Sequence, residues 1–289
     1  MKKIIFAVVV FLTLSAMAGT ASAGDVPASK QAEAGKGAGK IKIQLIRNAT
    51  MKITYAGKTI LADPMLSPKG AMDPFIGIAR NPTVELPMRT EEILAGVDGV
   101  LVTHDHPDHF DKTAGDIISK DISMICQPGD EVKRKKEGFK NSVSVEAAYT
   151  WKGINISRIG GRHGSGKILE MMGKVSGFVL QAKGEPTVYW IGDSVWCEEV
   201  ENAIKKYDPD IIITHSGGAK IPGFDPILMD AGQTIGVVKA SSKARVVAIH
   251  MESLDHCTVT RKGLRETADK AGIPAARLVI PEDGETISL

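Results

Sequence analysis

Hydrophobic and polar residues alternate with a period of two at the start of the region that we expect to fold. Such runs, separated by turn residues, predict three antiparallel strands at residues 41–46, 51–55 and 59–62. The third run ends at Asp63 and Pro64, where the proline stops strand pairing and leaves a carboxylate at the strand end. A strand-rich domain is therefore expected to begin at Ile41.

Apolar runs and amphipathic segments continue through the rest of the chain. Further strands are expected at residues 97–102, 122–126, 143–145, 154–159, 177–182, 187–191, 211–215, 246–250 and 278–280. Helices are expected at residues 90–94, 112–119, 131–137, 198–206, 233–240 and 264–271. Strands interleaved with helices in both halves predict two sheets with helices on both outer faces. Residues 65–89 and 216–229 are expected to be irregular loops that wall a binding pocket.

Two segments precede this predicted domain. Lys2 and Lys3, an apolar run over residues 4–14 and small residues up to Ala23 have the layout of a secretory signal peptide, so we expect residues 1–23 to be removed after Ala23. Residues 24–40 are rich in Gly, Ala and Lys and are expected to form a flexible spacer before a domain at residues 41–289. The mature protein is then expected to be periplasmic or secreted.

Composition and charge exclude several classes of function. Loss of Lys2 and Lys3 would change the formal charge from +2 to neutral, which leaves no electrostatic case for a nucleic-acid partner. No apolar stretch is long enough to span a bilayer, so stable membrane insertion is not expected. The 3 cysteines are scattered, which argues against a disulfide framework and against a zinc finger. Nothing in the sequence specifies an oligomeric state.

The loop that follows the predicted strand at residues 97–102 carries the densest group of polar side chains in the chain. Residues 104–109 hold the imidazoles of His104, His106 and His109 together with the carboxylates of Asp105 and Asp108. A solvated loop has no folding reason to collect these groups, whereas a pair of metal ions needs them. The loop therefore predicts a metal centre.

Other candidate ligands lie where predicted strands end. His163 lies in a glycine-rich loop, while Asp193, His215 and His250 close or follow apolar runs. Because strand ends at one sheet edge converge on a site in α/β folds, these side chains are expected to meet the metal loop. Imidazole and carboxylate suit two divalent ions, which we expect to be Zn, with Mn or Fe as alternatives. Two ions would share a bridging carboxylate and a hydroxide, and Asp193 suits the bridging role.

The order of these residues resembles the metallo-β-lactamase superfamily, in which the signature His-x-His-x-Asp-His is followed by a lone histidine, an aspartate and a strand-ending histidine. The resemblance covers residues 41–289 and implies a four-layer αβ/βα sandwich, an α/β fold. Several stretches, such as residues 61–64 and 215–219, look most like its ascorbate-6-phosphate-lactonase-like branch.

Carried over to this chain, the resemblance implies which residues bind each of the two metals and which residue supports the metal loop. It assigns the first metal to His104, His106 and His163, the second to Asp108, His109 and His250, and the bridge to Asp193. It also implies that Asp108 moves a proton during turnover and that Asp63 supports the metal loop without binding metal.

Three histidines compete for the last ligand position. We favour His250 because it ends a strand, over His215 and His256. His215 is expected either to be held by hydrogen bonds beside the ligands or to contact substrate. His256 and Glu252 are expected either to have structural roles or to support the ligands by hydrogen bonds.

The predicted function is that of an exported dinuclear metal-dependent hydrolase. A hydroxide bridging the metals would cleave an ester-like bond of a small molecule, such as a lactone, a carboxylic ester or a phosphoric ester. Two alternatives are a β-lactam hydrolase and a non-catalytic metal-binding protein, because ligands alone do not prove turnover.

Overall fold

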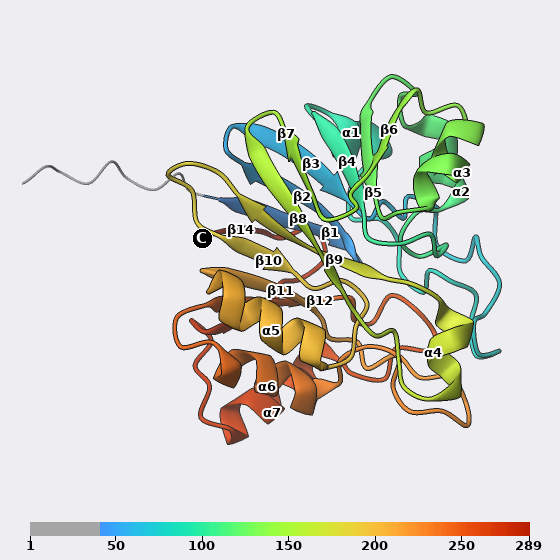
Figure 1. Ribbon diagram of the computed structural model, residues 1–289. Helices are drawn as coiled ribbons and strands as arrows, with labels where there is room; N and C mark the ends of the chain where they lie inside the picture. Colours follow the sequence, from blue (N-terminus) through green and yellow to red (C-terminus); the bar gives the residue numbers. More distant parts are fainter. Residues whose placement is uncertain (1–40) are drawn as a thin grey trace, which may run out of the picture. The chain divides into compact units, whose positions relative to one another are not determined.

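The computed structural model describes residues 41–289, which contain two seven-stranded sheets (Figure 1). The predicted signal peptide and spacer, residues 1–23 and 24–40, lie outside the described residues. Among the residues that the structure describes, no helix is long and apolar enough to cross a membrane.

The first sheet has the strand order β14-β1-β2-β3-β4-β5-β6. Its strands are β1 (Lys42–Arg47), β2 (Thr50–Tyr55), β3 (Lys58–Ala62), β4 (Gly99–Val102), β5 (Ser123–Cys126), β6 (Asn141–Ser144) and β14 (Thr286–Ser288). Strands β1 to β3 pair antiparallel, as the alternating pattern predicted, and β3 to β6 pair parallel.

The second sheet has the order β13-β12-β11-β10-β9-β8-β7. Its strands are β7 (Ala148–Trp151), β8 (Ile154–Gly160), β9 (Ser176–Gln181), β10 (Val188–Trp190), β11 (Ile211–His215), β12 (Arg245–Ile249) and β13 (Leu278–Val279). Strands β7 to β10 pair antiparallel, and β10 to β13 pair parallel.

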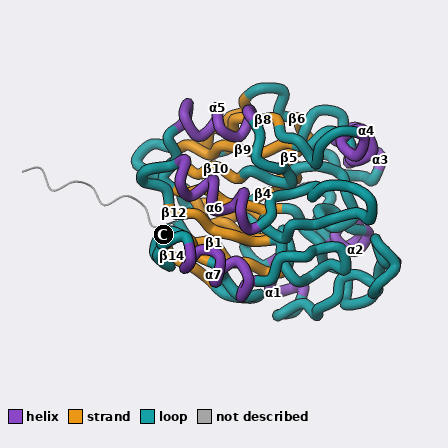
Figure 2. Tube along the Cα trace, turned by 90° about the horizontal axis from the view of Figure 1, so that it is seen from below, coloured by secondary structure: helices purple, strands orange, loops and turns teal. Residues whose placement is uncertain are grey.

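Helices cover the outer face of each sheet, which confirms the predicted four layers (Figures 1 and 2). On the first sheet lie α1 (Thr90–Leu94), α2 (Lys112–Ile117) and α3 (Asp130–Lys136), and on the second lie α5 (Glu198–Tyr207), α6 (Ala231–Ala240) and α7 (Arg261–Lys270). Buried side chains from both sheets, such as Ile53, Phe178 and Trp190, form the central core between them. Burial of this apolar surface is the main source of stability.

Three elements were not predicted from the sequence. These are β7, β14 and a short helix, α4 (Lys167–Met172). Strand β14 has only 3 residues, and α4 has 6 residues between Gly166 and Gly173, too few to show a periodic pattern. Strand β7 lies at the edge of its sheet and buries only Trp151, so its pattern of apolar residues is weak.

Parallel strands bring distant parts of the chain to one edge of the fold. Asp63 follows β3, the loop from Thr103 follows β4, Asp193 follows β10, His215 ends β11 and His250 follows β12. Since the carboxyl ends of parallel strands share one sheet edge, this topology is what assembles the candidate site.

Candidate metal centre

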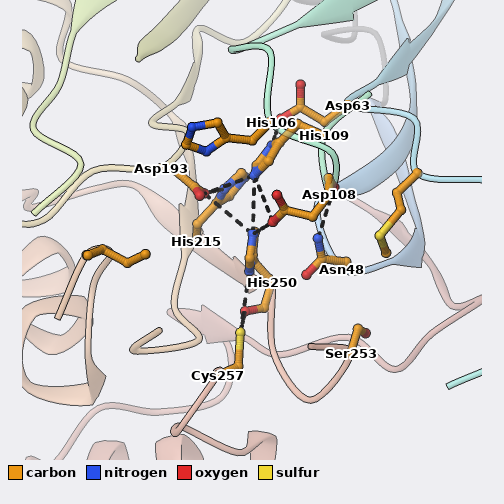
Figure 3. Close-up of polar contacts among 12 residues, drawn as sticks. Asn48, Asp63, His106, Asp108, His109, Asp193, His215, His250, Ser253 and Cys257 are labelled. Atoms are coloured by element: carbon orange, nitrogen blue, oxygen red, sulfur yellow. Dashed lines mark hydrogen bonds and ion pairs between the residues drawn. The ribbon is translucent and has the colours of Figure 1, made fainter. Parts of the chain in front are cut away.

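Two adjacent groups of potential metal ligands occupy this edge. His104, His106 and His163 form one group, and His109, Asp193, His215 and His250 form the other; within each group, one potential ligand atom from each residue lies within 4.8 Å of the others. Apart from His106, these side chains are buried. Several of them converge in Figure 3.

The first group has the geometry of three imidazoles facing one point. His104 Nε2 and His106 Nδ1 lie 3.0 Å apart, close to the ~3.3 Å between two nitrogens that bind one tetrahedral zinc. His104 Nδ1 bonds the Thr103 hydroxyl at 3.0 Å, and His163 Nδ1 donates to the Ile227 carbonyl at 2.7 Å. These partners leave the Nε2 lone pairs of His104 and His163 for a metal.

Asp108, which lies outside the second group as defined by distance, forms a nearly equilateral triangle of donor atoms with His109 and His250 of that group. His109 Nε2 lies 3.4 Å from Asp108 Oδ2 and 3.4 Å from His250 Nε2, and His250 Nε2 lies 3.3 Å from Asp108 Oδ2. Three ligands on one face of a tetrahedral ion are separated by about this distance. The residues present therefore fit a second divalent ion held by Asp108, His109 and His250.

Asp193, a member of the second group, also faces the first group. Its Oδ2 is 3.2 Å from His109 Nε2 and 3.5 Å from His163 Nε2, so one carboxylate oxygen faces a ligand from each set. This position suits a carboxylate that bridges two ions.

His215 belongs to the second group by distance, but both of its ring nitrogens already have partners. Nε2 accepts a hydrogen bond from the Trp190 indole at 2.9 Å, so Nδ1 carries the proton and donates to Asp193 Oδ1 at 2.5 Å. No lone pair of this imidazole remains for a metal. The structure thus favours the hydrogen-bonded role over a ligand role.

Asp63 supports the metal loop through hydrogen bonds. Its Oδ1 accepts the Thr103 backbone N–H at 2.7 Å, and its Oδ2 accepts the Thr103 hydroxyl at 2.6 Å and His109 Nδ1 at 2.7 Å. The bond from His109 leaves Nε2 of that ring to face the other ligands.

Backbone strain also occurs at this edge. Asp63 and His250 have φ values of 40° and 64°, in the left-handed region that non-glycine residues rarely adopt. Gly217 makes the approach of His250 possible, because a Cβ at Gly217 would lie 2.1 Å from the His250 carbonyl oxygen. Strain of this kind collects at functional sites.

The two groups differ in protonation. Burial lowers the pKa of His163 to about 4 and lowers the pKa of His104, so both rings are neutral at pH 7. Burial also opposes the charged form of His250, but the Asp193 carboxylate and a hydrogen bond to Asp108 outweigh it and raise the pKa to about 10. In the same way, Asp193 and Asp108 raise the pKa of His109 well above its usual value, against burial.

Metal binding is therefore expected to release protons from His109 and His250 of the second group. At pH 7 the metal-free protein holds protons on His109 and His250, and a metal displaces up to about two per chain. The apparent affinity of this group should rise with pH until His250 loses its proton near pH 10. Calorimetric titration in buffers of different ionisation enthalpy measures the release, and a second metal that binds at pH 7 without it would contradict the assignment.

A pocket of about 400 Å³ opens over the two groups. Its floor is formed by His106, Asp108, His163 and Asp193, and its walls by Pro74, Phe75, Pro107, Met172, Ile221, Ile227 and His256. Both loops expected to wall the pocket do so, and no Lys or Arg is among these lining residues.

The sequence pointed to the ligands but missed parts of their surroundings. No role was assigned to Trp190 from the sequence, but its indole N–H sets the tautomer of His215. Met172 reaches the pocket from the unpredicted helix α4. His256, which was expected to be structural or to support the ligands, lines the pocket. No local sequence pattern identifies these three residues, because each reaches the site through contacts with residues that are distant in sequence.

Fold, site and comparisons together define the class of protein. Residues 58–251 match the family described as the beta-lactamase superfamily domain, and the chain belongs to this family. It is a metal-dependent hydrolase of the metallo-β-lactamase superfamily, as the resemblance predicted.

Three similar bacterial proteins match over nearly their whole length. The chain is 36% identical over 252 residues to the UPF0173 protein YddR of Bacillus subtilis, covering 85% of this chain and 99% of the relative. A possible metal-dependent hydrolase from Veillonella parvula has 34% identity and a TM-score of 0.84, with 86% of this chain and all 100% of that one covered. An isothiocyanate hydrolase from Delia radicum gut bacteria has 36% identity and a TM-score of 0.80, covering 86% and 98%. These relatives do not carry the name of the lactonase-like branch, which stays a prediction.

Proposed function

We propose that the protein is a dinuclear hydrolase for small, uncharged and largely apolar substrates with an electrophilic carbon, such as lactones and carboxylic esters. The observation that carries this proposal is the apolar pocket directly over the two ligand groups. When bound, two divalent ions, Zn or else Mn or Fe, supply Lewis acidity and a water that is deprotonated near neutral pH.

The protein's own residues bind and orient the substrate in this proposal. Phe75, Ile221 and Ile227 surround its apolar part and exclude water. Asp108 also lines the pocket, so its carboxylate is placed to carry a proton to the leaving group. A phosphoric ester is a poorer candidate than a carboxylic ester, because no cationic side chain is among the lining residues to pair with it.

Measurement of the metal content of variants tests the proposed dinuclear metal centre. The wild-type protein is expected to bind about two metals per chain, and His104→Ala/His106→Ala to lose about one of them together with activity. Lys112→Ala, at an exposed position just after the same loop, serves as the control and should keep both. Full metal content in the double variant would contradict the proposal.

A substrate panel separates the remaining functions. Phenyl acetate and γ-butyrolactone test the ester proposal, bis-p-nitrophenyl phosphate tests the phosphoric ester, and a chromogenic cephalosporin tests a β-lactam hydrolase. Two bound metals with no turnover of any of these or of an isothiocyanate would favour a non-catalytic metal-binding protein instead.

Isothiocyanate hydrolysis is a second candidate. The isothiocyanate hydrolase from gut bacteria is 36% identical over almost its whole length, and an isothiocyanate is small, uncharged and electrophilic at carbon, as this pocket requires. Hydrolysis of benzyl isothiocyanate at a higher kcat/KM than phenyl acetate would select this candidate over the ester.

We also propose that the protein is exported through its N-terminal segment. The support is the signal-peptide pattern of residues 1–23. The intact mass of protein from the native host should correspond to a chain that begins at Gly24; a chain that retains residues 1–23 would contradict export by cleavage.

A further inference from the structure

His256 is buried at the pocket wall without a hydrogen-bond partner for its ring. The residue is only 5% exposed, and its Nδ1 is buried and unpaired. Among the described residues, neither ring nitrogen forms a hydrogen bond. Nε2 is not among the fully buried unpaired atoms, so it is the ring nitrogen that a molecule in the pocket can reach.

The backbone around His256 is fixed on two sides by the loops that wall the pocket. The Asp255 carboxylate accepts backbone N–H groups from Phe75, Ile76, Ile78 and Ala79, at 3.0, 3.2, 3.2 and 3.4 Å. The His256 carbonyl accepts the N–H of Lys220 at 2.9 Å. The imidazole is therefore held in place by contacts that leave its nitrogens unused.

The orientation of the ring decides which nitrogen is available. The Phe75 ring packs edge-on against the imidazole, with 5.0 Å between ring centroids. Because Nδ1 is buried while the residue lines the pocket, the ring presents its Nε2 edge to the cavity. Burial also lowers the pKa of His256, so the ring is neutral and its single N–H is best placed on Nε2.

His256 is also the one polar side chain of the pocket lining outside the ligand groups. The other wall residues are Pro74, Phe75, Pro107, Met172, Ile221 and Ile227. A molecule in this pocket finds apolar contacts everywhere except at the metal floor and at this imidazole.

We propose that His256 binds substrate by donating a hydrogen bond from Nε2 to an uncharged acceptor, so that the preferred substrates are apolar molecules with one acceptor besides the bond that is cleaved. The inference rests on the proposed function, since it concerns the same pocket, but its binding test needs no turnover.

Binding of matched probes tests the inference first. In the metal-loaded protein, cyclohexanone, which has an acceptor, should bind about tenfold more tightly than methylenecyclohexane, which lacks one. Cyclohexanone should also shift the ¹⁵N resonance of His256 Nε2. Equal affinities without a shift would overturn the inference, whether or not the protein hydrolyses any substrate.

Variants identify the nitrogen involved. His256→Phe keeps an aromatic ring without a donor and should remove the preference for cyclohexanone. His256→Gln places an amide near the Nε2 position and should restore part of this preference. His256→Asn, whose amide lies near the Nδ1 position, should not restore it. Met172→Leu, a change in the apolar wall, serves as the control and should alter both affinities equally. All variants should retain the wild-type metal content. A His256→Phe protein that keeps both metals and the full preference would show that the imidazole only fills space.

If the proposed function is correct, the same variant should affect kinetics in a defined way. With 4-acetylphenyl acetate, an ester that carries a second uncharged acceptor, His256→Phe should raise KM about tenfold and change kcat little, whereas phenyl acetate, which has no second acceptor, should show no such rise in KM. Loss of kcat at unchanged KM would instead assign His256 to the chemical step and overturn a binding role. A wild-type protein without turnover but with the probe preference would reject the proposed function and leave this inference standing.

Discussion

Asp63→Ala is expected to destabilise the metal-free protein by about 3–5 kcal/mol and to weaken the second metal about 10- to 100-fold. Asp63 is fully buried and accepts three hydrogen bonds, two from Thr103 and one from His109. Its loss leaves these donors unpaired in the interior and frees the His109 ring to turn away from its neighbours. Denaturant unfolding gives the change in stability, and metal titration gives the change in affinity.

Asp98 offers a matched control on the same sheet. Its carboxylate accepts the backbone N–H of Thr59 at 3.0 Å, but its side chain is 30% exposed and lies next to the start of β4, away from the ligands. Asp98→Ala should therefore cost about 1 kcal/mol and leave both metals in place. If Asp63→Ala behaved like Asp98→Ala, the support role of Asp63 would be wrong.

His215→Leu is expected to lower turnover about 10- to 100-fold while the protein retains both metals. The imidazole donates from Nδ1 to Asp193 Oδ1, and the Trp190 indole fixes this tautomer through Nε2. Leucine removes the donor that orients the proposed bridging carboxylate. Steady-state kinetics and metal analysis of the same preparations measure both effects.

Two further variants distinguish a positioning residue from a ligand. His215→Asn places an amide N–H near the position of Nδ1 and should recover part of the activity lost in His215→Leu. Trp190→Phe keeps an aromatic side chain but removes the N–H, so it should have a smaller effect than His215→Leu. Loss of a metal in His215→Leu, without recovery in His215→Asn, would show that His215 is itself a ligand.

The local sequence contained most of the information on the fold. Alternation in residues 41–62 and the apolar runs that became β4, β11 and β12 reflect burial of one or both strand faces, which a periodic pattern reveals directly. Elements without such a pattern, namely β7, α4 and β14, could not be found this way. They are too short or too exposed, and their neighbours in the fold stabilise them.

The site was predictable only to the extent that its residues are close in sequence or end apolar strands. His104, His106, Asp108 and His109 share one loop, and Asp193 and His250 follow strands, so their types and positions predict a metal centre. The contacts of Trp190 and His256 were not predictable, because they depend on which atoms of distant side chains meet.

By itself, the sequence determined the class of fold and the set of candidate ligands, because hydrophobic periodicity and ligand chemistry are local properties. The tertiary structure decided how the metal loop, residues 104–109, is used. It brings His104 and His106 close to His163, and it brings His109 and Asp108 close to His250. It also places His215 where its Nδ1 hydrogen-bonds Asp193 and does not face a metal. These choices depend on atom separations of 2.5–3.6 Å between strands far apart in the chain, which only the packing of the two sheets sets.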